Sequence, residues 1–105
     1  MRQFTPGELK AHLEGGAEPV LLDVREPWEY DLVRLPGSRL LPMGEIMNRM
    51  DELDAAAEIV VICHHGVRSR QVAHLLESRG FTDIINLRGG VDAWANEVDG
   101  EMPRY

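Results

Sequence analysis

The sequence predicts an α/β fold in which helices cover both faces of a central parallel sheet. Two short runs of almost continuously apolar residues, 20–24 and 58–62, have the composition of parallel strands buried on both faces. Segments with helical spacing of apolar side chains and with capping residues alternate with these runs. At 105 residues the chain is long enough to bury one core without disulfides, so we expect residues 1–105 to form a single domain.

The first helix is predicted to follow Thr5, whose side chain suits an N-cap. Glu8 stands three residues later, which is the spacing of a capping box. Pro6 fits the first helical position, where its missing N–H costs nothing. The pair Gly15-Gly16 is expected to end the helix, and the strand 20–24 follows directly.

The middle of the chain is predicted to hold two helices separated by a turn and a brief strand. Ile46, Met50 and Leu53 have the spacing of one apolar helix face. The expected elements are a short helix beginning at 26–30, a turn at 35–38, a strand at 39–41 and a third helix at 43–53.

The second half of the chain is predicted to alternate strand and helix twice. After the strand 58–62 comes a loop and then a helix over 69–79, which Gly80 caps. A strand at 82–87, a loop at 88–90 and a helix at 91–97 complete the pattern. Ligands of parallel sheets bind outside the carboxyl ends of the strands. The functional site is therefore expected at the end of the strand 58–62.

Charge and composition argue against two classes of partner. The net charge of −7 opposes nucleic acid, whose phosphates require a concentrated basic face. No apolar stretch approaches the roughly 20 residues of a membrane span. We therefore expect no nucleic-acid and no membrane partner. Residues 1–6 lack the apolar core of a secretion signal, and one cysteine cannot form an internal disulfide. A cytoplasmic location is expected, while a periplasmic form with its signal removed stays open.

The segment Cys63-His64-His65-Gly66-Val67-Arg68-Ser69 contains the only cysteine and carries the strongest functional signal. It joins a predicted strand to a predicted helix, so backbone N–H groups at the helix N-terminus converge on the sulfur. These groups and the helix macrodipole favour an anion. The sequence therefore predicts Cys63 as a nucleophilic thiolate, held in a six-residue loop, 63–68, that also suits a persulfide.

The other loop residues are predicted to shape the pocket around the sulfur. Gly66 allows tight curvature, and Arg68 offers a planar fork to an oxyanion such as a sulfonate. His64 and His65 are expected at the pocket mouth, where they add positive charge or relay protons. The predicted substrate-binding residues are His64, His65, Gly66, Val67 and Arg68.

Three motifs follow one another in a fixed order along the chain. They are Asp-Val-Arg-Glu-Pro-Trp-Glu-Tyr at 23–30 with Leu-Pro-Gly-Ser at 35–38, the cysteine segment at 63–69, and Leu-Arg-Gly-Gly-Val-Asp-Ala-Trp at 87–94. Together they resemble the motifs of the single-domain rhodaneses, a family of sulfurtransferases. The resemblance implies a rhodanese-like three-layer fold, with the parallel sheet between two layers of helices.

The same resemblance implies a thiosulfate sulfurtransferase with a two-step cycle and no cofactor. Cys63 takes the outer sulfur of a small anionic donor such as thiosulfate and becomes a persulfide. That sulfur then passes to cyanide, a thiol or a partner protein. Because the chain has no second cysteine, the acceptor must be external.

One segment departs from the family pattern. Rhodaneses commonly have Gly-His-Ile ahead of Pro-Gly-Ala, whereas this chain has Val33-Arg34-Leu35 ahead of Pro36-Gly37-Ser38. The replacement is expected to alter the local loop geometry, and Arg34 would add a positive group near the pocket.

Two alternative functions follow from the same loop. Phosphatases and arsenate reductases of related fold place five residues between cysteine and arginine, whereas four separate Cys63 from Arg68 here. The shorter loop makes a tighter nest, suited to one sulfur atom. A partner-binding or redox-sensing module stays open, because reactive cysteines are also easily oxidised.

Several other polar and aromatic residues are expected to be structural. Asp23 and Arg25 are interpreted as a buried pair that fixes the loop after a strand. The pair Gly89-Gly90 is interpreted as a tight turn between strand and helix, and Trp28 and Trp94 as core residues. No metal ion is expected, because adjacent His64 and His65 on a tight loop are poorly placed for tetrahedral zinc.

Overall fold

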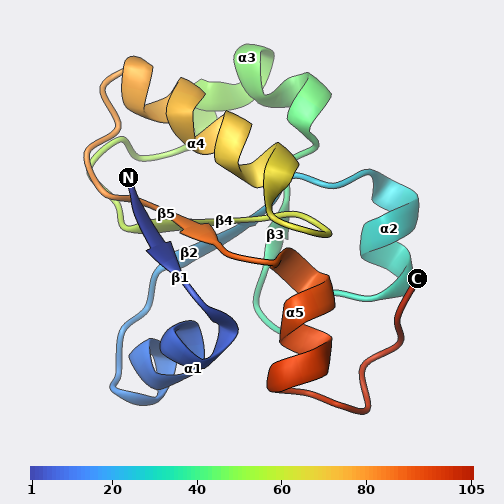
Figure 1. Cartoon of the computed structure of the whole chain (residues 1–105). Helices are drawn as coiled ribbons and strands as arrows, with labels where there is room; N and C mark the ends of the chain where they lie inside the picture. The colour runs from blue at the N-terminus through green and yellow to red at the C-terminus, as the bar shows by residue number, and fades with distance from the viewer.

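Five parallel strands form one sheet with helices on both faces (Figure 1). The computed structural model describes residues 1–105 and gives the strand order β1-β5-β4-β2-β3, with every neighbouring pair parallel. The predicted α/β fold with a parallel central sheet is confirmed. The strands are β1 Arg2–Phe4, β2 Val20–Asp23, β3 Arg39–Leu40, β4 Ile59–Ile62 and β5 Ile84–Leu87.

The helices form two layers. Helices α3 and α4 cover one face of the sheet, and α1 and α5 cover the other (Figure 1). Helix α2 lies near the end of the sheet where the site is found, with Tyr105 beside it. The bounds are α1 Pro6–Glu14, α2 Pro27–Leu32, α3 Ile46–Arg49, α4 Val67–Ser78 and α5 Gly90–Glu97. No helix is long and apolar enough to cross a membrane.

The core consists of two apolar clusters, one on each face of the sheet. Alternation along the strands divides the side chains between them. Leu22 and Val61 belong to the cluster under α3 and α4, whereas Leu21 and Val60 belong to the cluster under α1 and α5. Every residue of β4 is buried, as its apolar sequence predicts. The strand that leads into the cysteine segment is therefore held rigidly on both faces.

Helix α1 begins as predicted. Thr5 is its N-cap, and the Thr5 hydroxyl oxygen accepts a hydrogen bond from the Glu8 N–H at 3.2 Å. The Glu8 carboxylate accepts one from the Thr5 N–H at 2.9 Å, which completes the capping box. Pro6 occupies the first helical position, and the helix ends before Gly15.

One predicted element was wrong, and one element was missed. The segment 43–53 is not one helix but a four-residue α3 between two 3₁₀ turns, Met43–Glu45 and Met50–Glu52. Only Ile46 and Leu53 of this segment are buried, which is too little packing to sustain a continuous helix. The sequence analysis also did not identify β1, which is three residues long and contains only one apolar side chain.

The two tryptophans differ in their environment. Trp94 on α5 is buried, as predicted. Trp28 on α2 is 63% exposed, so its assignment to the core was wrong. The reason lies in α2 itself, because the one residue that this short helix buries is Glu29.

Candidate active site

Cys63 lies directly after β4, at the entrance to α4. The residue is 1% exposed. The Gly66 N–H donates a hydrogen bond to the Cys63 Sγ at 3.0 Å, and the Ser69 hydroxyl lies 3.3 Å from the same sulfur. A backbone N–H, a hydroxyl and a helix N-terminus thus surround one sulfur atom. The N–H group and the helix N-terminus favour an anion at this position, while the Ser69 oxygen accepts from the thiol.

The helix after the cysteine begins two residues earlier than predicted. Gly66 is the N-cap and adopts the left-handed conformation with φ of 95°, so α4 starts at Val67 and not at Ser69. A Cβ atom at Gly66 would also lie 3.0 Å from the backbone nitrogen of Gly89. Glycine is therefore required at 66 for two reasons. The loop shortens to 63–66, and Arg68 belongs to the first turn of α4.

The N-terminus of α5 holds the cysteine loop from the other side. The Val91 N–H donates to the Cys63 carbonyl at 2.8 Å, and the Asp92 N–H donates to the His64 carbonyl at 3.0 Å. A Cβ atom at Gly90 would collide with both carbonyl groups. The Gly89-Gly90 turn predicted from the sequence is confirmed, and it also allows the close approach of α5 to the loop.

A buried chain of polar groups starts at the sulfur. The Ser69 hydroxyl donates to Asn86 Oδ1 at 2.5 Å, and Asn86 Nδ2 donates to the Gly66 carbonyl at 3.4 Å. Asn86 Nδ2 also donates to the Gln3 side chain at 3.2 Å. Ser69 and Asn86 are 0% and 2% exposed. The sequence analysis missed this chain, although an asparagine within the apolar run of β5 was a usable signal.

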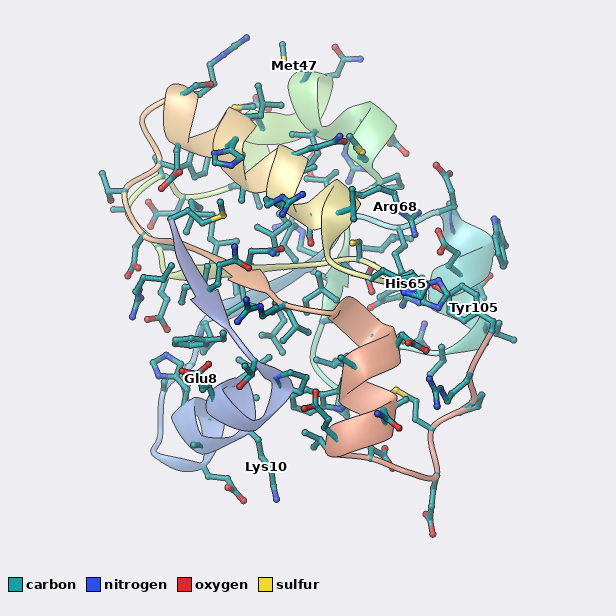
Figure 2. All side chains as sticks on the ribbon, viewed as in Figure 1. Glu8, Lys10, Met47, His65, Arg68 and Tyr105 are labelled. Carbon is teal, nitrogen blue, oxygen red and sulfur yellow. The ribbon has the colours of Figure 1, made fainter.

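Arg68 is paired within the protein. Its two terminal nitrogens donate to the two Glu29 carboxylate oxygens at 2.6 and 2.9 Å. These hydrogen bonds lower the pKa of Glu29 to about 2. The fork predicted to face a sulfonate is thus occupied by Glu29, which the sequence analysis did not identify. Figure 2 shows Arg68 on the side of the molecule where His65 and Tyr105 also lie.

Asp23 and Arg25 form the buried pair that the sequence predicts. Both are fully buried, and Arg25 Nη2 donates to Asp23 Oδ2 at 2.8 Å. The same nitrogen donates to the Val33 carbonyl at 2.6 Å, and Nη1 donates to the Tyr105 hydroxyl at 2.8 Å. The pair fixes the backbone that follows β2 and the backbone that follows α2.

The segment that departs from the family pattern keeps a packed backbone. Val33 and Leu35 are buried in the cluster under α1 and α5. The Arg34 guanidinium lies over the Tyr30 ring, 4.6 Å from its centroid. Arg34 lines a cavity of about 420 Å³ between α2 and residues 99–103, and the cysteine does not contribute to that cavity.

The two histidines of the loop lie in a row of rings. The rings of His64 and His65 are 4.0 Å apart, and the His64 ring stacks on Tyr105 at 3.9 Å with an interplanar angle of 9°. Burial lowers the pKa of His64, and the neighbouring His65 lowers it further. His65 and Val67 are exposed. Three rings, those of His65, His64 and Tyr105, therefore line one edge of the cysteine loop. The sequence analysis predicted the two histidines there but not Tyr105.

Comparisons with known proteins agree with this geometry. A family model described as "Rhodanese-like domain" matches residues 5–97. The "Thiosulfate sulfurtransferase GlpE" of Pseudomonas fluorescens is 34% identical over 95% of this chain and 90% of that protein. A crystal structure of a rhodanese-like domain protein from Staphylococcus aureus superposes with a TM-score of 0.86 at 30% identity, covering 100% of this chain and 99% of the other.

Some relatives are much longer than this chain. The Mycobacterium tuberculosis protein named "Probable adenylyltransferase/sulfurtransferase MoeZ" is 35% identical over 97% of this chain. The chain spans only 26% of the length of that protein.

Proposed function

The chain belongs to the rhodanese-like domain family, and we propose that it is a thiosulfate sulfurtransferase that carries sulfane sulfur as a persulfide on Cys63. The observation that carries the proposal is the position of the only cysteine, at the N-terminus of α4 with the Gly66 N–H directed at its sulfur. The 34% identity to a thiosulfate sulfurtransferase supports thiosulfate as the donor.

The first half of the cycle loads the cysteine. The Cys63 thiolate attacks the outer sulfur of thiosulfate, and a new S–S bond forms. The bond between the outer sulfur and the sulfonate group breaks, and its electron pair leaves with sulfite. The Gly66 N–H and the α4 macrodipole favour the anionic sulfur before and after this step.

The second half of the cycle removes the sulfur from Cys63. A nucleophile such as cyanide or a thiolate attacks the outer sulfur of the persulfide, and Cys63 leaves as a thiolate. The products are thiocyanate or a persulfide on the acceptor. With one cysteine in the chain, no internal thiol competes for that sulfur, which favours transfer to an external thiol or protein.

The predicted substrate-binding residues have distinct roles in this proposal. Gly66 contributes its N–H, and His64, His65 and Val67 border the entrance. Two of the five N–H groups of Arg68 bind Glu29, and three, the Nε–H among them, have no partner in the chain; the side chain is 35% exposed. We propose that the Nε–H, which points away from the fork paired with Glu29, meets the sulfonate of the incoming donor.

The proposal is tested by the intact mass of the reduced protein before and after incubation with thiosulfate. The wild type is expected to gain one sulfur atom and to lose it again when cyanide is added. The variant Cys63→Ala is expected to gain nothing, because it lacks the nucleophile. Its circular dichroism spectrum should match the wild type, since the change removes one sulfur atom from a buried position.

Two outcomes would contradict the proposal. Sulfur transfer near the wild-type rate in Cys63→Ala would exclude Cys63 as the carrier. A wild-type mass that does not change, with Cys63 still open to alkylation, would favour a partner-binding module or a different donor.

A further inference from the structure

Tyr105 contacts the site although it lies outside every motif used above. The family model ends at residue 97, and Tyr105 belongs to the segment that follows α5. This segment crosses back towards α2, so that Tyr105 lies at the same end of the molecule as the labelled His65 (Figure 2). The contact is therefore a property of this chain that the shared motifs do not explain.

The Tyr105 hydroxyl joins two ion pairs. It accepts a hydrogen bond from Arg25 Nη1 at 2.8 Å and donates one to Glu29 Oε2 at 2.7 Å. These directions are fixed, because a guanidinium only donates and a carboxylate only accepts. Glu29 is the residue that holds both terminal nitrogens of Arg68. One hydroxyl thus ties the Asp23–Arg25 pair to the Glu29–Arg68 pair.

The Tyr105 ring packs against the cysteine loop. It stacks on the His64 ring at 3.9 Å, and the exposed Trp28 makes an edge-to-face contact with it at 5.7 Å. The charged groups around His64 are His65, Asp92, Glu29 and Arg68. The backbone of His64 is already held by α5 through the Asp92 N–H. The His64 side chain is held by the tilted His65 ring and by the parallel stack on Tyr105.

We propose that Tyr105 is a positioning residue of the sulfurtransferase site, with a separate task for each part of its side chain. The hydroxyl fixes Glu29 and through it Arg68, which sets the affinity for the anionic donor. The ring fixes His64 beside the cysteine loop, which sets the geometry of the loop during transfer. The inference deepens the proposed function and rests on it for its kinetic predictions.

The test compares Tyr105→Phe and Tyr105→Ala with the wild type. The phenylalanine variant keeps the ring and loses the hydroxyl, so KM for thiosulfate should rise several-fold while kcat stays close to the wild type. The alanine variant loses both contacts, so kcat should also fall, by about tenfold, because the loop is less well positioned. Circular dichroism at the assay temperature establishes that both variants are folded.

A readout independent of activity is the NMR titration of the His64 imidazole. In Tyr105→Ala the ring no longer covers His64, so its pKa should rise towards the usual value of 6.5. In Tyr105→Phe the stacking persists and the titration should match the wild type. Glu101→Ala, an exposed change in the same segment, is the control and should alter neither the kinetics nor the titration.

The outcomes separate the two proposals. Unchanged KM, kcat and His64 titration in Tyr105→Ala would overturn the role of Tyr105 while the persulfide on Cys63 stands. A wild type that transfers no sulfur would overturn the proposed function. The His64 titration would then decide whether Tyr105 positions the loop. The positioning role would also be overturned by a combination of two results. Tyr105→Ala would lose activity only in proportion to the protein that is unfolded, and Tyr105→Phe would have the KM and kcat of the wild type.

Discussion

Ser69 is the side chain that links the Cys63 sulfur to the buried polar groups of the protein. Its hydroxyl lies 3.3 Å from Cys63 Sγ and donates to Asn86 Oδ1. With the thiol present, the S–H donates to the Ser69 oxygen. When the sulfur becomes anionic, the Ser69 hydroxyl is the nearest side-chain donor that can turn towards it. Ser69 therefore contacts the atom that we propose to react in both of its protonation states.

Removal of the Ser69 hydroxyl should lower the reactivity of Cys63 more than it lowers the stability of the protein. We expect Ser69→Ala to lower sulfur transfer by about tenfold to a hundredfold, which is less than the roughly hundredfold to thousandfold loss for a dedicated oxyanion-hole donor, because the Gly66 N–H remains on the sulfur. It should also slow alkylation of Cys63 by iodoacetamide at pH 7. The free energy of unfolding should fall by about 1–3 kcal/mol, because Asn86 Oδ1 loses its donor in a buried position.

Ser78→Ala is the matched control at the other end of α4. The Ser78 hydroxyl is exposed and donates to the Leu75 carbonyl, so its loss should leave both alkylation and transfer unchanged. Alkylation and transfer at wild-type rates in Ser69→Ala would show that the hydroxyl does not act on the sulfur.

The residues of the site were predictable only where they are neighbours in the sequence. Cys63 and Gly66 stand in one short segment, and a strand followed by a helix places the glycine N–H near the sulfur. Glu29 and Arg68 are 39 positions apart, and Tyr105 and Glu29 are 76 apart. Such contacts depend on how the elements pack, so a single sequence does not indicate them. The pairing of Arg68 with Glu29 was missed for this reason.

At the scale of the elements, the site is built where two helix N-termini meet one loop. Helix α4 directs the Gly66 N–H at the sulfur, and α5 directs the Val91 and Asp92 N–H groups at the loop carbonyls. The two helices pack on opposite faces of the sheet. The loop is thus fixed from both layers of the fold.

The approach of α5 to the loop predicts that position 90 tolerates no side chain. In Gly90→Ala the new Cβ would collide with the Cys63 and His64 carbonyl groups, and the backbone there has φ of 61°. We expect a loss of about 1–3 kcal/mol in the free energy of unfolding, measured with urea. Sulfur transfer in the remaining folded protein should also fall, since the loop must move.

Gly44→Ala is the comparison for this change. A Cβ at Gly44 meets nothing within 4 Å, so the stability and the activity of the Gly44→Ala variant should stay near those of the wild type. Equal stability of Gly90→Ala and Gly44→Ala would mean that α5 does not constrain the cysteine loop.

The strongly patterned elements were predictable, and the weakly patterned ones were not. The apolar runs of β2, β4 and β5 and the capping box of α1 are local signals, and each produced the expected element. The strand β1 pairs with β5, and its short polar sequence contains no local signal for this. The segment 43–53 has helical spacing, but its few buried residues leave it broken into short turns.

At the scale of the whole molecule, Glu29 joins parts of the chain that the sheet does not connect. It lies on α2, accepts from Arg68 of α4 and from Tyr105 beyond α5, and is 3% exposed. Its carboxylate is therefore a buried charge whose partners come from separate elements. The stability of the assembled protein should depend on the ionisation of this group.

This dependence predicts a loss of stability in acid. The pKa of Glu29 is lowered to about 2 from its usual 4.5, chiefly by the hydrogen bonds from Arg68. A lowered pKa contributes stability above about pH 4.5, and that contribution disappears as the pH falls towards 2. Its size is at most about 3 kcal/mol. Urea unfolding at several pH values should show a shallower acid dependence in Glu29→Gln.

Glu52→Gln is the control for the acid experiment. Glu52 forms exposed ion pairs with Arg49 and Arg39, and such pairs contribute little because solvent screens them, so this variant should follow the acid profile of the wild type closely. A Glu29→Gln profile as steep as that of the wild type would contradict a central role for Glu29.

The pairing of β1 with β5 determines when the site is completed during synthesis. Arg2 pairs with Ile85, so β1 has no partner within this domain until β5 has also left the ribosome. Pairing between such distant segments is slow compared with local folding. Asn86 of β5 contacts both Ser69 and Gln3 of β1. The Cys63 segment therefore emerges together with its direct partners Gly66 and Ser69, whereas the contacts from Asn86 and from α5 that hold this segment in place form only after β5 and α5 have been synthesised.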